Sequence, residues 1–301
     1  MKAAIDSILV PTDGSDVSTL GARVGIDLAA RADADLHVLS VVESATVEPV
    51  LDGDQPEERT ERERALEARA SDAVDAVAGR AMTHLQGRVT TAVEWGEPFR
   101  EIDDYVESND VDIVVMGTHG RTGLDRVLGS VANKTLRTAS VPVVTVPPSA
   151  DDVPVGEATY EDVLLPTDGS DEAALALDWA LALVGLYDGT LHTVYSVDTS
   201  WFGGHDGVPE VHDALEARGE QALDAIRERA READVSVRAS IGTGPAARAI
   251  GSYCERNDVD MIAMATHGRS GVERYLIGSV TETVVRTSDV PVCCVPIPED
   301  T

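Results

Sequence analysis

Apolar residues occur along this chain in two arrangements, which alternate from one end to the other. In the first arrangement they form short uninterrupted runs, as expected for strands of a parallel sheet that is covered on both faces. In the second they recur at helical spacing, as do Leu20, Val24 and Leu28, which give one apolar face to a helix predicted over residues 15–31. The alternation predicts an α/β fold with parallel sheets and right-handed crossovers.

The predicted strands fall into two groups, one in each half of the chain. In the first half they cover residues 7–10, 36–42, 88–93, 111–116 and 142–146. In the second half they cover residues 162–165, 191–197, 235–241, 259–264 and 292–295. The predicted helices of the first half cover residues 15–31, 57–85 and 131–138, and a further helix begins at Pro98, where the missing N–H of proline is tolerated.

The two halves share several short motifs in the same order, which indicates an internal duplication. Pro-Thr-Asp-Gly-Ser follows the first strand of each half, and Thr-His-Gly-Arg follows the fourth. A segment rich in proline, serine and aspartate separates the halves and is expected to be extended and solvated. We therefore predict two tandem domains, residues 1–148 and 160–301, joined by a linker of residues 149–159.

Glycine-containing loops follow the first and fourth strands, at the edge where open α/β sheets bind ligands. In the first half these loops begin at Pro11 and Gly117, and Gly129 and Ser130 then open the next helix. A helix N-terminus with free N–H groups is a ready site for phosphate, whereas the carboxylate of Asp13 suits a ribose hydroxyl or an exocyclic amine. Simple tight turns are the alternative, but the recurrence of the whole pattern favours a ligand site.

With these loops the sequence resembles the universal stress protein (UspA) family, whose ATP-binding members carry G-x2-G-x9-G-[ST] after the fourth strand and an aspartate after the first. The resemblance covers nearly the whole chain except the linker and the loops at residues 43–57 and 198–209. It implies that each half is a doubly wound α/β domain with a parallel five-stranded sheet of the adenine nucleotide alpha hydrolase-like kind. It also implies ATP or AMP as the ligand, with Mg²⁺ held through the phosphates.

The resemblance assigns a set of nucleotide contacts to each half. The adenine and ribose contacts of the first half are Pro11, Thr12, Asp13 and Val41. Its phosphate contacts are Gly117, Gly120, Gly129, Ser130 and Val131. The matching residues of the second half are Pro166, Thr167, Asp168, Ser196, Gly268, Gly278, Ser279 and Val280.

Neither half matches the family motif fully. The first half has only eight residues between Gly120 and Gly129. A missing residue shifts a chain by up to about 3.5 Å, which predicts that Gly129 and the helix start are displaced from the phosphates. The second half has the full spacing, but Ala265 replaces the first glycine and Ser196 stands at the place of Val41. We therefore expect the second half to suit phosphates better and the first half to suit adenine better.

Other polar residues near these loops have more than one interpretation. His119 and His267 contact phosphate or cap the turn, and Arg121 and Arg269 pair with phosphate or with a surface carboxylate. No pair of nucleophile and base recurs between the halves, and no cysteine spacing is typical of a zinc site. We therefore expect no catalytic residues and no metal ligands, and we expect the three cysteines to be free thiols.

The chain carries 54 acidic and 24 basic residues, a net charge of −30. Such a charge repels nucleic acid and anionic lipid, so neither is expected as a partner. Because the acidic residues are spread along the chain, we interpret them as a halophilic, solvated surface, with a docking surface for a cationic partner as the alternative. No apolar run is long enough for a membrane span, and a strand follows Met1 too soon for a signal peptide, so we expect a cytoplasmic protein.

The resemblance, taken with these features, implies a regulatory stress-response protein that binds an adenine nucleotide and is not an enzyme. A slow, Mg-dependent ATP hydrolase and an interaction module without a ligand are the alternatives. Isolated domains of the family usually pair through their last strands. Residues 142–146 and 291–295 are apolar and would be exposed edges if left alone, so we predict that they pack the halves as a pseudo-dimer. Assembly into a homo-oligomer is left open.

Overall fold

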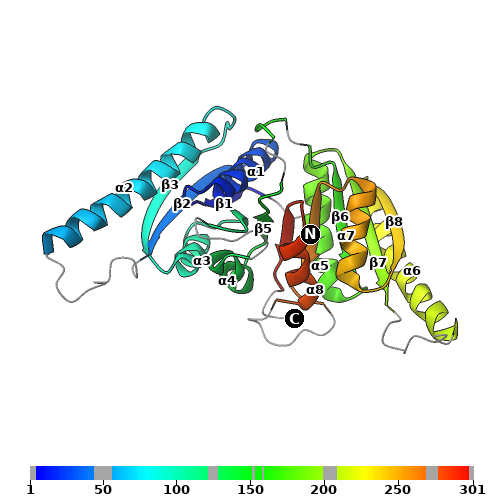
Figure 1. Cartoon of the computed structure of the whole chain (residues 1–301). Helices are drawn as coiled ribbons and strands as arrows, with labels where there is room; N and C mark the ends of the chain where they lie inside the picture. Colours follow the sequence, from blue (N-terminus) through cyan, green and yellow to red (C-terminus); the bar gives the residue numbers. More distant parts are fainter. Residues whose placement is uncertain are drawn as a thin grey trace. The chain divides into compact units, whose positions relative to one another are not determined.

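The computed structural model describes residues 5–43, 56–120, 128–150, 153–157, 159–198, 209–268 and 277–297. These residues fall into two compact units, which divide between residues 158 and 159. Each unit is an α/β domain built from alternating strands and helices (Figure 1).

The first domain contains a five-stranded parallel sheet. Its elements are β1 (Ser7–Pro11), α1 (Asp16–Ala32), β2 (Asp35–Glu43), α2 (Pro56–Ala81), β3 (Val89–Gly96), α3 (Pro98–Ser108), β4 (Ile113–Gly117), α4 (Ser130–Thr138) and β5 (Val143–Val146). The strands follow the order β3-β2-β1-β4-β5, and each neighbouring pair is parallel. The order changes direction between β1 and β4, which is the point where doubly wound sheets bind ligands.

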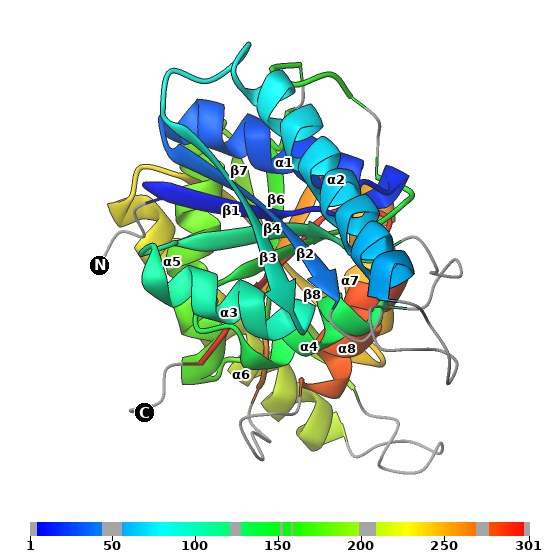
Figure 2. The ribbon, with the colours of Figure 1, turned by 90° about the vertical axis from the view of Figure 1, so that its left-hand side faces the viewer.

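Helices cover both faces of this sheet, with α1 and α2 on one face and α3 and α4 on the other (Figure 2). The interior strand β4 is buried along its whole length, which explains why its sequence is an uninterrupted apolar run. The edge strand β3 contains only half-buried and exposed positions. The structure therefore confirms the prediction that β4 is a strand covered on both faces, and places it inside the sheet between β1 and β5.

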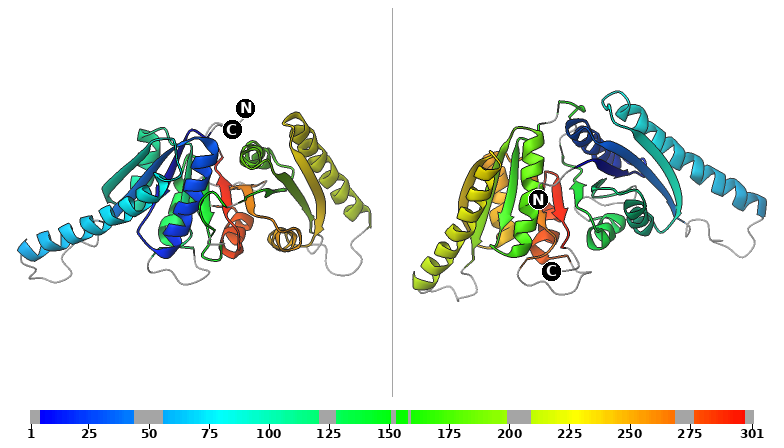
Figure 3. Two further views of the ribbon diagram at one scale, coloured as in Figure 1. Left: turned by 90° about the horizontal axis from the view of Figure 1, so that it is seen from above. Right: turned by 180° about the vertical axis from the view of Figure 1, so that it is seen from behind.

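The second domain repeats this arrangement. Its elements are β6 (Asp162–Thr167), α5 (Asp171–Leu186), β7 (Thr190–Val197), α6 (Pro209–Glu232), β8 (Ser236–Thr243), α7 (Ala246–Asn257), β9 (Met261–Ala265), α8 (Ser279–Thr287) and β10 (Val292–Val295). Its strands follow the order β10-β9-β6-β7-β8 and are parallel, with α5 and α6 on one face and α7 and α8 on the other (Figure 3). Two doubly wound five-stranded domains are confirmed.

Several helices are followed by an aspartate in the left-handed backbone conformation, with φ between 49° and 58°. These aspartates are Asp33, Asp110, Asp188, Asp234 and Asp258. Glycine or asparagine usually takes such a position, but aspartate tolerates it because its short polar side chain can bond locally. Part of the acidic composition therefore serves to end helices before the next strand.

The linker is not uniformly extended, in contrast to the expectation from its composition. Residues 155–157 form a turn, in which the N–H of Glu157 donates to the carbonyl of Pro154 at 3.0 Å. The N–H of Gly156, whose φ is 86°, donates to the buried carboxylate of Asp27 on α1 at 2.9 Å. This turn is therefore fixed to the first domain, because a buried carboxylate needs a hydrogen-bond donor.

Candidate functional site

A cavity of about 310 Å³ lies at the carboxyl ends of β1 and β4 in the first domain. It is lined by every first-domain residue that the resemblance assigns to a nucleotide, namely Pro11, Thr12, Asp13, Val41, Gly117, Gly120, Gly129, Ser130 and Val131. The other lining residues are Ser18, Leu39, Glu43, Pro98, Ile102, Met116, Thr118, His119 and Ala132. The volume lies at the lower end of the range of small-molecule sites.

The loop after β1 is a turn that is held by its own hydrogen bonds. Gly14 has a φ of 74°, in the region that favours glycine. Its N–H donates to Thr12 Oγ1 at 3.2 Å, and the N–H of Ser15 donates to Asp13 Oδ1 at 3.0 Å. The side chain of Ser15 then caps α1 by accepting from the N–H of Ser18 at 3.2 Å. The Pro-Thr-Asp-Gly-Ser motif therefore sets the positions of Thr12 and Asp13.

The loops after β1 and β4 meet at an aspartate and a glycine. A Cβ atom at Gly120 would lie 2.7 Å from Oδ2 of Asp13. The second domain has the same arrangement, since a Cβ at Gly268 would lie 2.8 Å from Oδ2 of Asp168. Glycine at this position therefore leaves room for the carboxylate between the two loops.

Gly117, the first glycine of the motif, is required by helix packing. A Cβ there would lie 2.7 Å from the carbonyl oxygen of Val17, and a Cβ at Gly21 on α1 would lie 2.7 Å from the nitrogen of Gly117. The backbones of α1 and β4 are therefore almost in contact. In the second domain the corresponding residues are the buried Ala176 and Ala265, and Ala265 does not have a positive φ. The alanine that breaks the motif is thus accompanied by a second alanine on the facing helix.

The first turn of α4 forms the polar end of the cavity. The N–H of Gly129 donates to the carbonyl of Thr118 at 2.8 Å, so it is already used. The next N–H groups, of Ser130 and Val131, belong to a turn that supplies no intrahelical acceptor, and both residues line the cavity. This turn contains no acidic residue, which leaves the positive end of the helix dipole open to an anion.

The shortened loop of the first domain does not displace α4, so the prediction of a displaced phosphate end is wrong. The N–H of Gly129 lies 2.8 Å from the carbonyl of Thr118, and the N–H of Gly278 lies 2.7 Å from the carbonyl of Thr266. Both glycines have a φ of −60°. This shared hydrogen bond fixes the helix start in each domain, independent of the loop length. Residues 121–127 and 269–276, with both motif arginines, lie outside the described residues.

In each domain a histidine lies in the loop after the fourth strand, and its Nδ1 atom forms a hydrogen bond with the preceding threonine. His119 Nδ1 lies 2.7 Å from the hydroxyl of Thr118, and His267 Nδ1 lies 3.1 Å from the hydroxyl of Thr266. The Nε2 atom of each ring is buried and has no hydrogen-bond partner within the described part of the chain. Burial lowers the pKa of His267, partly offset by Glu172. His119 lines the cavity, and its Nδ1 serves the turn.

The second domain places its predicted residues on matching loops and at a matching helix start. These residues are Pro166, Thr167, Asp168, Gly268, Gly278, Ser279 and Val280. However, the hydroxyl of Ser196 is used, because it donates to the carbonyl of Gly244 at 2.6 Å. The first turn of α8 also carries Glu282, whose carboxylate opposes a phosphate at this helix end. The N-terminus of α8 is therefore less favourable for an anion than that of α4, contrary to the expectation from loop length.

One wall of the cavity is apolar, and no motif indicated it. It is formed by Leu39 on β2, Ile102 on α3 and Met116 on β4. All three are buried residues that read as ordinary core positions in the sequence. Only the position of the cavity beside them distinguishes them, so no local signal could have identified them. Such a wall suits a planar base better than a phosphate.

The cysteines are free thiols, as predicted. Cys293 and Cys294 are buried on β10, and Cys254 is half-buried on α7. Burial raises the pKa of Cys254 and of Cys293 to about 12, which makes both unreactive at neutral pH. Within the described ranges, no group of three or more histidine, cysteine, aspartate or glutamate side chains is arranged to hold a metal ion.

The fold and the cavity define a doubly wound α/β protein with a ligand site at the topological switch point. Residues 4–147 and 159–296 each match the universal stress protein family. The chain therefore belongs to this family. None of the helices that the structure describes is long and apolar enough to cross a membrane.

Relatives support this assignment. The universal stress protein MJ0531 of Methanocaldococcus jannaschii is 33% identical over 147 residues, which cover 48% of this chain and 86% of that protein. The universal stress protein Rv2005c of Mycobacterium tuberculosis is 29% identical over 189 residues, 62% of each chain. The solved structure of a universal stress protein from Archaeoglobus fulgidus has the same fold, with a TM-score of 0.72, 23% identity and coverage of 97% of this chain and 98% of that one.

Proposed function

We propose that the first domain binds an adenine nucleotide, ATP or AMP, and that the protein is a regulatory stress protein rather than an enzyme. The supporting observation is that the residues assigned to a nucleotide come from separate loops and line one cavity. In this proposal the apolar wall takes the base, the carboxylate of Asp13 accepts from ribose hydroxyls, and the first turn of α4 takes the phosphates.

The absence of a side chain at Gly129 makes the polar end of the cavity fit a phosphate chain. A Cβ at Gly129 would lie 3.1 Å from the carbonyl oxygen of Thr118, so the loop and the helix start are tightly packed. The N–H groups of Ser130 and Val131 can then be approached without an intervening side chain. Mg²⁺ would be held through the phosphates and would need few protein ligands.

We propose the first domain as the tighter of two sites. Its α4 lacks an acidic residue in the first turn, whereas α8 carries Glu282 there. A carboxylate at a helix N-terminus occupies the position that favours an anion and repels a second one. Adenine nucleotide binding by the second domain is therefore expected to be weaker.

Binding without turnover is favoured over a slow ATP hydrolase by the hydrogen bonding of Asp13. Its Oδ1 already accepts the N–H of Ser15, so this oxygen serves the turn. A hydrolase would need a base that is positioned to activate water. The remaining alternative, an interaction module without a ligand, would leave the cavity without a use.

Isothermal titration of the full chain with ATP in high salt tests the proposal. Asp13→Asn is expected to weaken binding by about tenfold, because the ribose loses a charged acceptor worth roughly 1.4 kcal/mol. Asp168→Asn makes the same change in net charge at the equivalent position of the second domain and is expected to leave the tighter site unchanged.

Three outcomes would contradict parts of this proposal. No heat with ATP up to about millimolar concentration, where the binding free energy is only about −4 kcal/mol, would exclude nucleotide binding. Equal weakening by both variants would exclude the preference for the first domain. Steady release of phosphate from ATP and Mg²⁺, abolished by Asp13→Asn, would replace the regulatory proposal with the hydrolase.

A further inference from the structure

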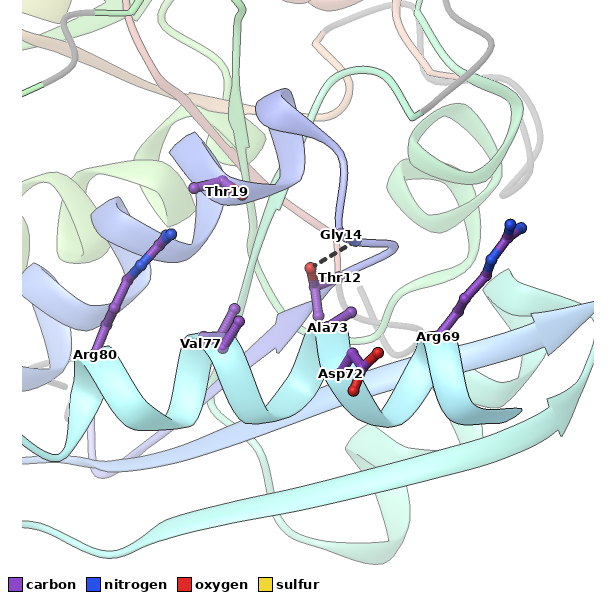
Figure 4. A pocket seen from close by; sticks show the side chains of 9 residues that line it. Thr12, Gly14, Thr19, Arg69, Asp72, Ala73, Val77 and Arg80 are labelled. Carbon is purple, nitrogen blue, oxygen red and sulfur yellow. Dashed lines mark hydrogen bonds between the residues drawn. The ribbon is translucent and has the colours of Figure 1, made fainter. Parts of the chain in front are cut away.

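A second cavity, of about 570 Å³, lies between α1 and α2 of the first domain, and we call it the α1–α2 groove. Its lining residues are Thr12, Gly14, Thr19, Arg69, Asp72, Ala73, Ala76, Val77 and Arg80. Figure 4 shows the side chains of α2 on one side and the loop after β1 with the start of α1 on the other. The groove adjoins the candidate nucleotide cavity at Thr12, and its other lining residues differ from those of that cavity.

Two arginines of α2 lie along the groove. Arg69 and Arg80 are eleven positions apart, which is close to three helical turns, so both lie on the same face about 16 Å apart along the axis. Neither side chain forms an ion pair with any residue in the described ranges. This is unusual in a chain with 54 acidic and 24 basic residues, where a carboxylate partner is easy to find.

In the second domain the position equivalent to Arg80 has a different role. Buried residues of α2 and α6 correspond at a constant offset, Val74 with Leu223 and Val77 with Ile226. The same offset places Arg229 at the position of Arg80. Arg229 forms an ion pair with Asp178, which ties α6 to α5.

The first domain cannot form the equivalent ion pair. The position of Asp178 on α5 corresponds to Arg23 on α1, so a positive charge replaces the negative one. Thr19 also adds a hydroxyl to the groove, where the second domain has Ala174. The two domains thus differ in a coordinated way, with a neutralised arginine in one and an unpaired arginine beside a cavity in the other.

We propose that the α1–α2 groove binds a small polyanion that carries phosphate groups. Guanidinium groups bind phosphate through paired, charge-assisted hydrogen bonds, and two of them at separate points of one groove suit an extended anion. Asp72 places one carboxylate in the lining, so the lining carries a net charge of +1. A ligand with one carboxylate gains little binding free energy from a lining with a net charge of +1. A ligand with several negative charges can contact both arginines.

Titration of the full chain with magnesium-free linear inorganic polyphosphate, in chains long enough to span the about 16 Å between the two arginines, tests the proposal, because this probe carries the negative charge without a nucleobase. The test compares the double variant Arg69→Gln and Arg80→Gln with the double variant Arg218→Gln and Arg229→Gln. Arg218 and Arg229 are the equivalent residues of α6, so both variants change the net charge by the same amount. Binding is expected to weaken at least about tenfold in the first variant and to be unchanged in the second.

Each other result overturns the proposal. Equal weakening in both variants would show a general charge effect. Binding that survives in the first variant but is abolished by excess ATP would place the probe in the nucleotide cavity instead. Absence of binding to the unmodified chain would exclude the groove as a polyanion site, whether or not ATP binds. Thermal melts of both variants serve as a folding control, and little change is expected because all four substituted side chains are exposed and the ion pair of Arg229 with Asp178 lies near the surface.

Discussion

Gly14 stands in the turn after β1, where its φ of 74° would strain another residue, whereas Gly117 stands in a strand and has no positive φ. Gly117 is needed because α1 and β4 approach closely, with Gly21 on the facing helix. The glycines near the ligand loops are therefore needed for two different reasons, a positive φ at Gly14 and the close approach of α1 and β4 at Gly117. The two alanines in the second domain show that the close approach is one of two solutions, not a condition for the fold.

Substitutions at this contact are expected to be costly alone and less costly together. Gly117→Ala and Gly21→Ala should each lower the free energy of unfolding by about 1–3 kcal/mol, because each methyl group meets backbone atoms that cannot rotate away. The double variant should cost less than the sum, since one outward shift of α1 accommodates both methyl groups. Denaturant unfolding of the full chain measures the three values.

Gly79→Ala provides the control for these variants. A Cβ there has no atom within 4 Å, and the residue is exposed on α2, so alanine should stabilise the helix by roughly 0.5–1 kcal/mol. Additive costs for the two substitutions at the α1–β4 contact would contradict the idea of a shared helix shift.

At the scale of the elements, α3 and α4 share an interface that contains a half-buried carboxyl group. Burial raises the pKa of Asp103 to about 6, although a hydrogen bond with Thr138 lowers it. Oδ1 of Asp103 is buried and has no partner among the described residues. The folded state therefore favours the protonated form of this group, which ordinarily has a pKa of 3.8.

The pH dependence of stability follows from this shift. Because the folded pKa is raised, the contribution of Asp103 is complete below its ordinary pKa and is lost as the pH rises through about 6. Asp103→Asn should therefore raise the melting temperature at about pH 8 and change it little at about pH 4. Asp104→Asn, an exposed neighbour with the same charge change, should have a smaller effect. An equal effect of the two substitutions at both pH values would contradict the role of burial.

At the scale of the whole molecule, the dominant feature is the net charge of −30. Like charges spread over a surface repel one another and destabilise the compact state when they are not screened. Some of these carboxylates end helices or accept hydrogen bonds from the linker, but these roles occupy few of them. The remaining carboxylates repel one another, so the stability of this fold should depend on the salt concentration.

Lowering the KCl concentration from about molar to tens of millimolar should lower the melting temperature, because the screening length rises from about 3 Å to more than 10 Å. Thermal melts in KCl, with sucrose at matched osmolarity as the control, measure this. A melting temperature that does not change with KCl would argue against a surface adapted to high salt.

The pseudo-dimer stays a prediction from the two apolar last strands, β5 and β10. A cysteine scan tests it in the full chain, with Cys254 and Cys294 replaced by serine. Val144→Cys, or a cysteine at a neighbouring position, should form an intramolecular disulfide with Cys293 when the reduced, unfolded chain is refolded under mild oxidation, because refolding exposes the Cys293 thiol before the fold buries it and a disulfide requires Cα atoms within about 7 Å. Mobility on a non-reducing gel reports the bond. No cross-link at any scanned position of β5 would exclude the pairing.

The sequence by itself determined the class of fold, the duplication and the elements, because hydrophobic periodicity reflects which faces of each strand and helix are buried. The burial of β4 and the start of α3 at Pro98 follow from local patterns of this kind. The sequence also located the glycine loops, because a turn such as the one at Gly14 requires a residue that tolerates a positive φ.

Only the tertiary structure decided which residues share a cavity and what each glycine is for. Leu39 and Ile102 line the candidate site only because β2 and α3 end beside it. The helix start at Gly129 is kept in place by a hydrogen bond to Thr118, across the segment whose shortened length suggested a displacement. Whether Arg80 faces a carboxylate or an open groove depends likewise on the residue that the facing helix presents. Contacts between distant segments leave no periodic trace in the sequence, and so they appear only when the chain is folded.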